Sequence, residues 1–188
     1  MNKFNELKKE IAEIISKSPL EFDPGHSKKT LEWVLKLKPG ADEALQIAAL
    51  AHDMERGVTG ITETYGLKDL SNIKEFKKEH AKRSAEIIAD LMEKYNYDKE
   101  IIARIKFLVE KHDEGGDDEE LNILTDADSI AFFDFHITMY YEKNGREKTE
   151  DKIRFMLERV SEKAKEIIKN IKYYNPEVSK LVKEVTSK

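Results

Sequence analysis

One short stretch of the chain joins an apolar helix to two groups that bind metal ions. Ala48 to Ala51 are apolar, and His52 and Asp53 follow them directly. A mostly buried helix should not end in an adjacent imidazole and carboxylate unless both side chains find partners. A divalent metal ion satisfies both at once, since imidazole and carboxylate are common ligands of such ions. The pair therefore predicts a metal site to which other parts of the chain contribute further ligands.

Further candidate ligands lie on separate predicted elements. The chain contains five histidines: His26, His52, His80, His112 and His136. A metal site in a helical bundle needs such a distribution, because its ligands converge from different helices. His136 has no motif around it, and we expect it to face solvent or the rear of the core. Asp126 and Asp128 compete for one ligand role, since side chains two positions apart on a helix point ~200° away from each other.

The composition limits both the chemistry and the partners. The chain has no cysteine, which excludes disulfides and thiolate groups, so a metal ion must be held by His, Asp or Glu. The formal net charge of −5 argues against a nucleic-acid-binding surface. No apolar run approaches the ~20 residues of a membrane span, and the first residues lack a signal-peptide pattern. We therefore expect a soluble cytoplasmic protein with no membrane partner.

The elements that must position these residues are predicted to be helices. Apolar side chains recur at helical spacing in the segments 3–17, 27–38, 41–56, 71–95, 99–111, 119–143, 149–173 and from residue 176 onward. The segment 22–26 is predicted as a turn because it contains proline and glycine. The segment 57–70 is predicted as a loop between helices. Asn144 and Gly145 are predicted to end a helix.

These segments predict one all-α domain that spans residues 1–188. No repeat, linker or change of composition divides the chain, and no segment alternates between polar and apolar residues as strands do. The hydrophobic content of 39% is enough for a core in a chain of this length. The composition leaves the oligomeric state open.

The candidate ligands follow the order H…HD…H…H…D and have characteristic neighbours. His52 and Asp53 end the sequence Leu-Ala-His-Asp, and Asp128 lies in Ala-Asp-Ser-Ile-Ala. His80 opens a helical stretch with serine and alanine at the fourth and fifth positions after it, and His112 ends a helix. This pattern resembles the HD superfamily of metal-dependent phosphohydrolases. A subfamily signature such as the GYP motif is missing, so the resemblance gives no subfamily.

The resemblance covers residues 24–133 and implies a helical bundle of the HD type, on which C-terminal helices of residues 149–188 pack. It implies a metal site whose ligands are His26, His52, Asp53 and Asp128. It also selects Asp128 over Asp126. Two imidazoles and two carboxylates suit Mn, Fe, Zn or Mg better than soft metals. His80 and His112 match positions where two-metal members have further ligands, so the resemblance implies one or two ions.

The same resemblance implies hydrolysis of a phosphate ester, by a phosphomonoesterase or a phosphodiesterase. In such an enzyme Asp53 would orient a metal-activated water for in-line attack. Arg56, and with it His80 and His112, would bind the phosphate oxygens. The acidic surface favours a small phosphorylated substrate such as a nucleotide. For Arg56 the alternative is a surface cation near a helix end.

Two other functions are consistent with the same residues. HD-fold oxygenases with two iron ions use a similar series of His and Asp to activate dioxygen. A domain that is stabilised by a metal ion and binds a nucleotide as a regulator is a non-catalytic alternative. Metal content, oxygen uptake and phosphatase activity distinguish the three.

Overall fold

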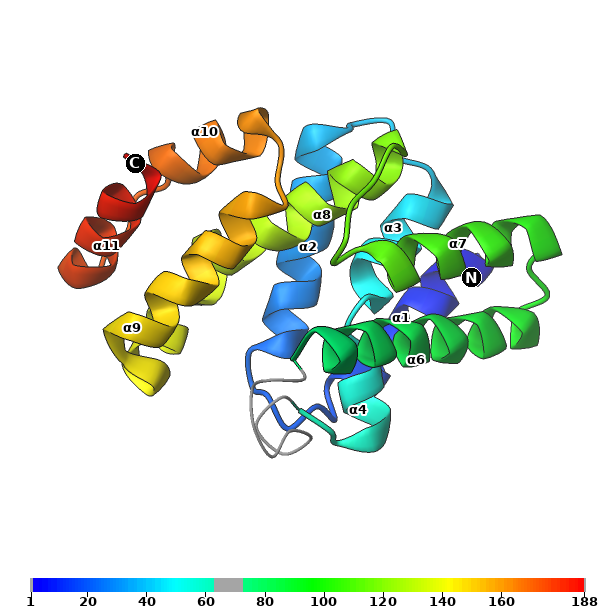
Figure 1. The fold of residues 1–188 in the computed structure, drawn as a ribbon. Coiled ribbons are helices and arrows are strands. Elements are labelled where there is room, and N and C mark those ends of the chain that lie inside the picture. Colours follow the sequence, from blue (N-terminus) through cyan, green and yellow to red (C-terminus); the bar gives the residue numbers. More distant parts are fainter. Residues whose placement is uncertain (1, 63–72, 188) are drawn as a thin grey trace.

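Helices form in almost every segment where apolar residues recur at helical spacing. The computed structural model describes residues 2–62 and 73–187, and this part of the chain contains helices and no strand. The elements are α1 (Lys3–Ile15), α2 (Asp23–Leu37), α3 (Glu43–Ala51), α4 (Glu55–Thr59), α6 (Ile73–Lys94), α7 (Lys99–Lys111), α8 (Glu119–Ala131), the π-helix η2 (Phe132–His136), α9 (Ile137–Glu158), α10 (Glu162–Asn170) and α11 (Pro176–Thr186). The prediction of an all-α fold is confirmed (Figure 1).

Capping side chains set the first residue of two helices that lead to candidate ligands. Asp42 accepts a hydrogen bond from the amide of Leu45 at 2.9 Å, at the start of α3. Asp118 accepts one from the amide of Leu121 at 2.9 Å, at the start of α8. Each carboxylate satisfies an amide that the first helical turn leaves without a partner. Local sequence therefore fixes where these two helices begin.

Two apolar clusters form the core on either side of α2. The first is built by α1, α3, α6 and α7, with large buried side chains that include Leu7, Leu45, Ile88, Met92 and Ile105. The second is built by the end of α8, η2, α9, α10 and α11, and includes Phe132, Phe133, Ile153, Ile168 and Leu181. Trp33 and Leu37 of α2 pack against both clusters. Figure 1 accordingly shows α2 between the hairpin of α6 and α7 and the group α9 to α11.

The segment 41–56 is not the single helix that its apolar pattern predicts. α3 ends at Ala51, a turn covers residues 52–54, and α4 begins at Glu55. The turn redirects the chain so that α4 packs on α1. The prediction of a loop is therefore wrong for residues 57–59, and its part at 63–70 lies outside the described residues.

The segment 22–26 forms the first turn of α2, whereas the sequence predicted a turn that precedes this helix. α2 begins at Asp23, and Pro24 occupies its first turn. Proline is favoured at this position, because the first helical turn leaves its N–H groups without intrahelical partners. His26 is therefore held rigidly by α2 instead of by a preceding loop.

The predicted end of a helix at Asn144 and Gly145 is a kink inside α9. Gly145 has φ 77° and ψ 179°, and α9 continues beyond it to Glu158. Glycine adopts a positive φ without the steric cost that a side chain would bring. Helical geometry is therefore interrupted where the sequence predicts a helix end, and a second helical stretch follows the kink within α9.

The helix predicted for residues 149–173 is broken where α9 gives way to α10. Ser161 precedes α10, and its amide and hydroxyl both donate hydrogen bonds to Asp126 of α8, at 2.8 and 2.5 Å. The break contains neither glycine nor proline. A contact from another helix, rather than a local signal, sets its position.

Within residues 2–62 and 73–187, no helix is both long enough and apolar enough to cross a lipid bilayer.

Candidate metal centre

The predicted site residues meet at a cavity of about 420 Å³. Six of them border it: His26, Asp53, Arg56, His80, His112 and Asp128. His52 lies next to them, buried to 1% exposure and in contact with His26 and Asp53. Residues from α2, the turn between α3 and α4, α6, the end of α7 and α8 therefore converge on one place.

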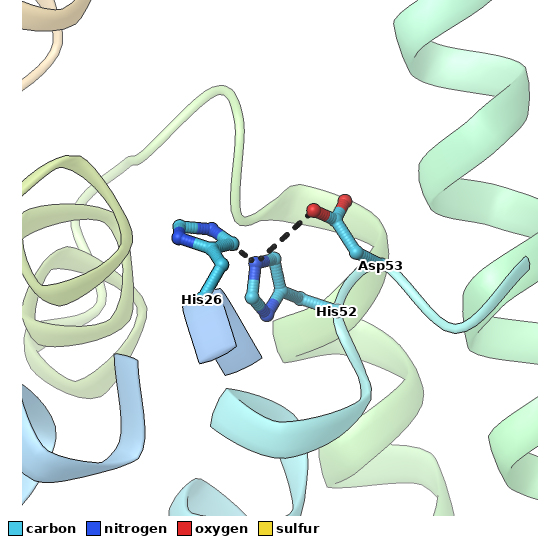
Figure 2. Close-up of side chains that lie close together, drawn as sticks. All are labelled: His26, His52 and Asp53. Carbon is cyan, nitrogen blue, oxygen red and sulfur yellow. Dashed lines mark hydrogen bonds and ion pairs between the residues drawn. The ribbon is translucent and has the colours of Figure 1, made fainter. Parts of the chain in front are cut away.

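Four side chains bring their donor atoms together at the wall of this cavity. Nε2 of His52 lies 3.2 Å from Nε2 of His26, and 3.5 Å from carboxylate oxygens of Asp53 and Asp128 (Figure 2). Nε2 of His26 lies 2.9 Å from Oδ1 of Asp128. Two ring nitrogens and two carboxylates in a buried space are stable only with a proton or a metal cation among them. His26, His52 and Asp53 bring one donor atom each to within 4.8 Å of one another, as a divalent ion requires, and Asp128 adjoins them through both histidines.

The charges of the centre favour a cation strongly. Burial acts to lower the pKa of His52, but Asp53 and Asp128 raise it to about 9. For Asp128, burial acts to raise the pKa, yet Arg159, His26 and His52 hold it well below its ordinary value. Both pKa shifts have the same cause. The carboxylates of Asp53 and Asp128 lie close to the imidazoles, and all of these groups are shielded from water.

The ends of two helices orient two of the histidines in the same way. His52 follows α3 and its Nδ1 lies 3.0 Å from the carbonyl oxygen of Ala49. His112 follows α7 and its Nδ1 lies 2.7 Å from the carbonyl oxygen of Val109. The last carbonyls of a helix have no intrahelical partner, so each accepts a hydrogen bond from Nδ1–H. This bond selects the tautomer whose Nε2 carries a lone pair, the form that binds metal ions.

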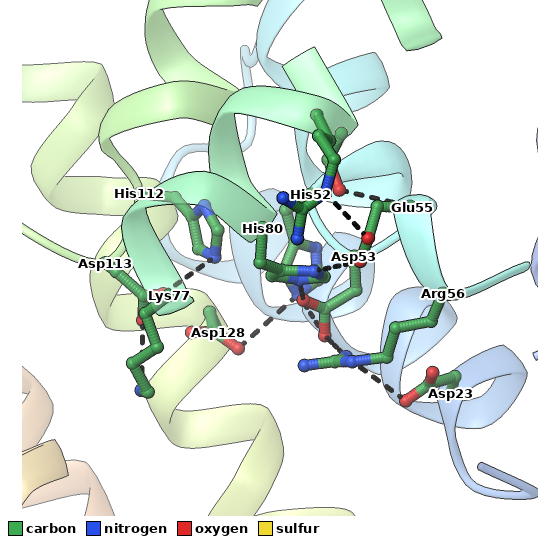
Figure 3. A network of polar contacts seen from close by, with 12 residues as sticks. Asp23, His52, Asp53, Glu55, Arg56, Lys77, His80, His112, Asp113 and Asp128 are labelled. Atoms are coloured by element: carbon green, nitrogen blue, oxygen red, sulfur yellow. Dashed lines mark hydrogen bonds and ion pairs between the residues drawn. The ribbon is translucent and has the colours of Figure 1, made fainter. Parts of the chain in front are cut away.

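His80 is held by a buried carboxylate of α4. Its Nδ1 lies 2.7 Å from Oε2 of Glu55, and its Nε2 lies 2.8 Å from Oδ1 of Asp53 (Figure 3). Glu55 is fully buried, and its other oxygen accepts a hydrogen bond from Nε of Arg83 at 2.8 Å. Burial acts to lower the pKa of His80, but hydrogen bonds to Asp53 and Glu55 raise it. His80 thus contacts the centre by its hydrogen bond with Asp53. It belongs to neither of the two groups of side chains whose donor atoms lie close enough together to bind one ion.

Arg56 reaches the centre from α4 instead of lying on the surface. Its Nη1 lies 2.5 Å from Oδ2 of Asp53 and 3.5 Å from Oδ1 of the buried Asp23. Burial acts to raise the pKa of Asp53, yet Arg56 and His52 hold it well below its ordinary value. Figure 3 shows Arg56 directed between the two carboxylates. The arginine therefore compensates the charge of a candidate metal ligand.

A second group of possible ligands lies beside the first. His112, Asp113 and Asp128 bring one donor atom each to within 4.8 Å of one another. Asp113 is bound by Arg159 at 2.5 Å and lies 3.6 Å from Nζ of Lys77. The negative charge of this group is already compensated by Arg159 and Lys77. It differs from the predicted second set, because it contains Asp113 where the sequence pattern has His80.

The two aspartates of α8 point in different directions, as their spacing predicts. Asp128 faces His26 and His52. Asp126 binds the amide and hydroxyl of Ser161, on the side where α10 begins. Asp128 is therefore the only one of the two that takes part in the centre.

The expectation that His136 faces solvent or the rear of the core is wrong. His136 ends the π-helix η2, is 6% exposed and lines the cavity. Its ring stacks on Phe22 with centroids 4.5 Å apart and meets the ring of His26 edge-on at 4.8 Å. Burial lowers its pKa well below the ordinary value, so it is a neutral imidazole. The expectation rested on the absence of a motif around His136. It did not foresee the π-helical turn, which contains more residues than an α-helical one and changes which side chains face inward.

Four functional residues were not found from the sequence: Glu55, Asp113, Arg159 and His136. The first two carried a local signal, because Glu55 lies close to Asp53 and Asp113 is adjacent to His112. Arg159 carried none, since it lies outside residues 24–133 and reaches the centre only through the fold.

The comparisons with known proteins give one finding. A family model described as Domain of unknown function (DUF4202) matches residues 4–182, which include all residues of the centre. Comparisons with curated proteins and with solved structures found no match. Inference about function therefore starts from the chemistry of the site rather than from a relative.

Proposed function

The chain belongs to the family described as Domain of unknown function (DUF4202), and we propose that it is a metal-dependent phosphohydrolase of the HD type acting on a small phosphate ester. One observation carries the proposal. The donor set of His26, His52, Asp53 and Asp128 shares a cavity with several cationic side chains. Metal ligands that face cations across a small cavity are the arrangement that phosphoryl transfer needs.

The residues of the centre would divide the work of hydrolysis. A divalent ion held by the four ligands would lower the pKa of a water molecule and stabilise the charge that develops on the phosphate. Asp53 has one carboxylate oxygen near His52 and the other near His80, so it is placed to orient a nucleophilic water. His80 and His112 border the same cavity and are placed to contact phosphate oxygens.

The cations of the cavity would bind the phosphate group. Arg56 and Lys77 line it beside the carboxylates, and Lys143 and Lys152 line it from α9. Arginine and lysine bind phosphate oxygens through charge-assisted hydrogen bonds. A cavity of about 420 Å³ is in the range that encloses a small molecule. A mononucleotide or a comparable ester suits it better than a polymer.

The proposal is tested with protein loaded separately with Mn²⁺, Fe²⁺, Zn²⁺ or Mg²⁺. Release of phosphate or of p-nitrophenol is measured from p-nitrophenyl phosphate, bis(p-nitrophenyl) phosphate and a panel of mononucleotides. We expect activity with at least one ion, lost on chelation and restored by adding the ion back. We also expect His52→Ala and Asp53→Ala to lose metal and activity together.

Two results count against the proposal, and each identifies what is wrong. A protein that holds a metal ion but hydrolyses no ester of the panel is not the proposed enzyme. A His52→Ala protein with full metal content by elemental analysis shows that the ligands are misassigned.

A further inference from the structure

Arg159 is a buried cation that comes to the centre from the C-terminal helices. It directly follows α9, and its side chain is 6% exposed and borders the cavity. All four candidate ligands come from earlier in the chain, between His26 and Asp128. Arg159 thus connects the C-terminal helices directly to one of the candidate ligands, Asp128.

The guanidinium of Arg159 donates hydrogen bonds to oxygen atoms of three residues, and Nη2 also lies 3.0 Å from Sδ of Met156. Nε donates to Oγ of Ser129 at 3.0 Å, Nη1 donates to Oδ1 of Asp113 at 2.5 Å, and Nη2 donates to Oδ2 of Asp128. These donors have a fixed planar geometry, so the three acceptors define the position of the guanidinium completely. In return, the guanidinium fixes the two carboxylates relative to each other.

The contact with Asp128 decides which oxygen of that carboxylate faces the histidines. Oδ2 is occupied by Arg159, whereas Oδ1 lies 2.9 Å from Nε2 of His26 and 3.5 Å from Nε2 of His52. A free carboxylate could rotate and offer both oxygens. The arginine leaves one oxygen for a metal ion and holds it in place.

A neighbouring contact keeps the backbone of Arg159 in position. Asp126 of α8 binds the amide and hydroxyl of Ser161, two positions after Arg159. The same helix therefore holds the break between α9 and α10 at two points, through Asp126 and through Asp128. Such a joint restricts where the arginine side chain can reach.

We propose that Arg159 is a positioning residue of the metal centre, which fixes Asp128 as a ligand through a single oxygen and thereby makes the C-terminal helices part of the site. This inference rests on the proposed metal site, and it concerns a residue outside the part of the chain that resembles the HD superfamily. Partners that orient a metal ligand typically change metal affinity by about 10- to 100-fold when they are removed.

The decisive variant is Arg159→Lys, because it keeps the positive charge and loses the planar fork. Lysine cannot hold Ser129, Asp113 and Asp128 in one plane. We expect Co²⁺ affinity to fall by about tenfold or more, and the visible spectrum of bound Co²⁺ to change with the coordination of Asp128. A purely structural role would lower stability and leave the spectrum unchanged.

Two control variants separate this effect from general damage. Arg104→Lys alters another arginine that binds two carboxylates, at 2.7 and 2.9 Å from Asp118 and 2.8 Å from Glu120, away from the cavity. Ser161→Ala removes the hydroxyl bond of the joint but keeps the amide bond to Asp126, so the backbone of Arg159 should stay in place. Both should unfold at lower denaturant concentration than wild type and bind Co²⁺ with unchanged affinity and spectrum.

If Arg159→Lys does not fold, Ser129→Ala takes its place, since it removes only the acceptor of Nε and should weaken Co²⁺ binding by a smaller factor. The inference is overturned if the folded variant binds Co²⁺ with the affinity and spectrum of the wild type. It is also overturned if the affinity falls equally in Ser161→Ala. A wild type that binds no ion would refute the proposed function, and this inference with it.

Discussion

Asp126 and Asp128 show how neighbouring residues of one helix serve different purposes. Asp128 presents one oxygen to His26 and His52, whereas Asp126 holds the start of α10 through Ser161. Both are largely buried carboxylates, so burial alone would not distinguish a ligand from a structural group. The direction of each side chain, set by the period of the helix, makes the distinction.

Substitution of these two aspartates should therefore give opposite results. Asp128→Asn removes a charged ligand, and we expect loss of metal and of metal-dependent activity. Asp126→Asn weakens hydrogen bonds to Ser161, and we expect a loss of stability of about 1–3 kcal/mol with metal content retained. Elemental analysis and urea denaturation measure the two effects. The reverse ranking would place the ligand at residue 126.

His80 gives a second prediction at this scale. Its Nε2 is bonded to Asp53 and its Nδ1 to Glu55, and it lies outside both groups of metal-compatible donors. We expect His80→Ala to keep the metal stoichiometry of the wild type and to lower kcat/KM by roughly 10²-fold, since a lost hydrogen bond to a charged phosphate costs about 1.5–3 kcal/mol. A fall from two ions to one would instead identify His80 as a ligand of a second ion.

Among the elements, α4 depends on a very close approach to α1. A Cβ added to Gly57 would lie 2.1 Å from the carbonyl oxygen of Ile14, whereas one added to Gly40 would meet nothing within 4 Å. Alanine normally favours a helix over glycine, but the clash with backbone atoms reverses the sign here. We expect Gly57→Ala to destabilise the protein by about 1–3 kcal/mol, and Gly40→Ala to change stability by less than about 0.5 kcal/mol.

Denaturation curves of the two alanine variants measure this difference. Because α4 carries Glu55 and Arg56, Gly57→Ala should also reduce activity, whereas Gly40→Ala should not. Equal stability of both variants would mean that α4 does not pack on α1 in this way.

Asp118, at the start of α8, makes the stability of the fold depend on pH. Arg104 and the amide of Leu121 bind Asp118 and lower its pKa from the ordinary value of 3.8 to about 2. A folded-state pKa below that of the unfolded chain stabilises the protein above the unfolded value, and this contribution is lost as the pH falls through the folded value. We expect stability to fall between about pH 4 and pH 2 less steeply in Asp118→Asn than in the wild type, when both are followed by denaturation at each pH.

The sequence predicts the helices better than it predicts their interruptions. Periodic apolar residues are a local signal, and they predicted α1, α7 and α11 nearly as observed, together with the start of α8. The single helix predicted for residues 119–143 is instead divided into α8, η2 and the first part of α9. The breaks at residues 52–54 and 159–161 depend on distant contacts, of Gly57 with Ile14 and of Ser161 with Asp126. Such contacts can end a helix whose apolar residues continue at helical spacing, even where the break contains no glycine or proline.

The same distinction applies to the site. The candidate ligands were predicted because they stand in a recognisable order with the pair His52 and Asp53 at its centre, and the structure brings them together. Arg159 and His136 have no such order around them, and only the packing of α10 and η2 against α8 brings them to the cavity. Side chains that act through tertiary contacts leave little trace in local sequence.

For the whole molecule, a bound ion should link ligands from three parts of the fold. They come from α2, the turn after α3 and α8, and Arg159 adds the C-terminal helices. An ion that binds only the folded state at a free concentration of 100 times Kd adds about 2.7 kcal/mol to stability. In a chain of this length that corresponds to a rise in Tm of roughly 5–10 °C.

Thermal unfolding with and without chelator measures this linkage. Trp33 packs against both apolar clusters, so its fluorescence should follow the same transition as the far-ultraviolet circular dichroism. We expect the ion to shift both signals together. His52→Ala serves as the control, and we expect the ion to leave its Tm unchanged. A shift as large as in the wild type would show that the ion binds elsewhere.

The π-helix η2 fixes the length of the chain between α8 and α9. Its wider turn places one residue more between Phe132 and Ile137 than an α-helix would need. Loss of a single residue from η2, with return to α-helical geometry, would leave α9 near its present direction, because the wider turn accommodates that residue. Loss of a residue between η2 and Tyr140 would instead rotate the rest of α9 by about 100° relative to α8. The ligands on α8 and earlier helices would stay in place, while Tyr140, Lys143 and Lys152 would turn away from the cavity that they line. Single-residue deletions between η2 and Tyr140 are therefore a route by which substrate preference can change in one step while the metal ligands remain as they are.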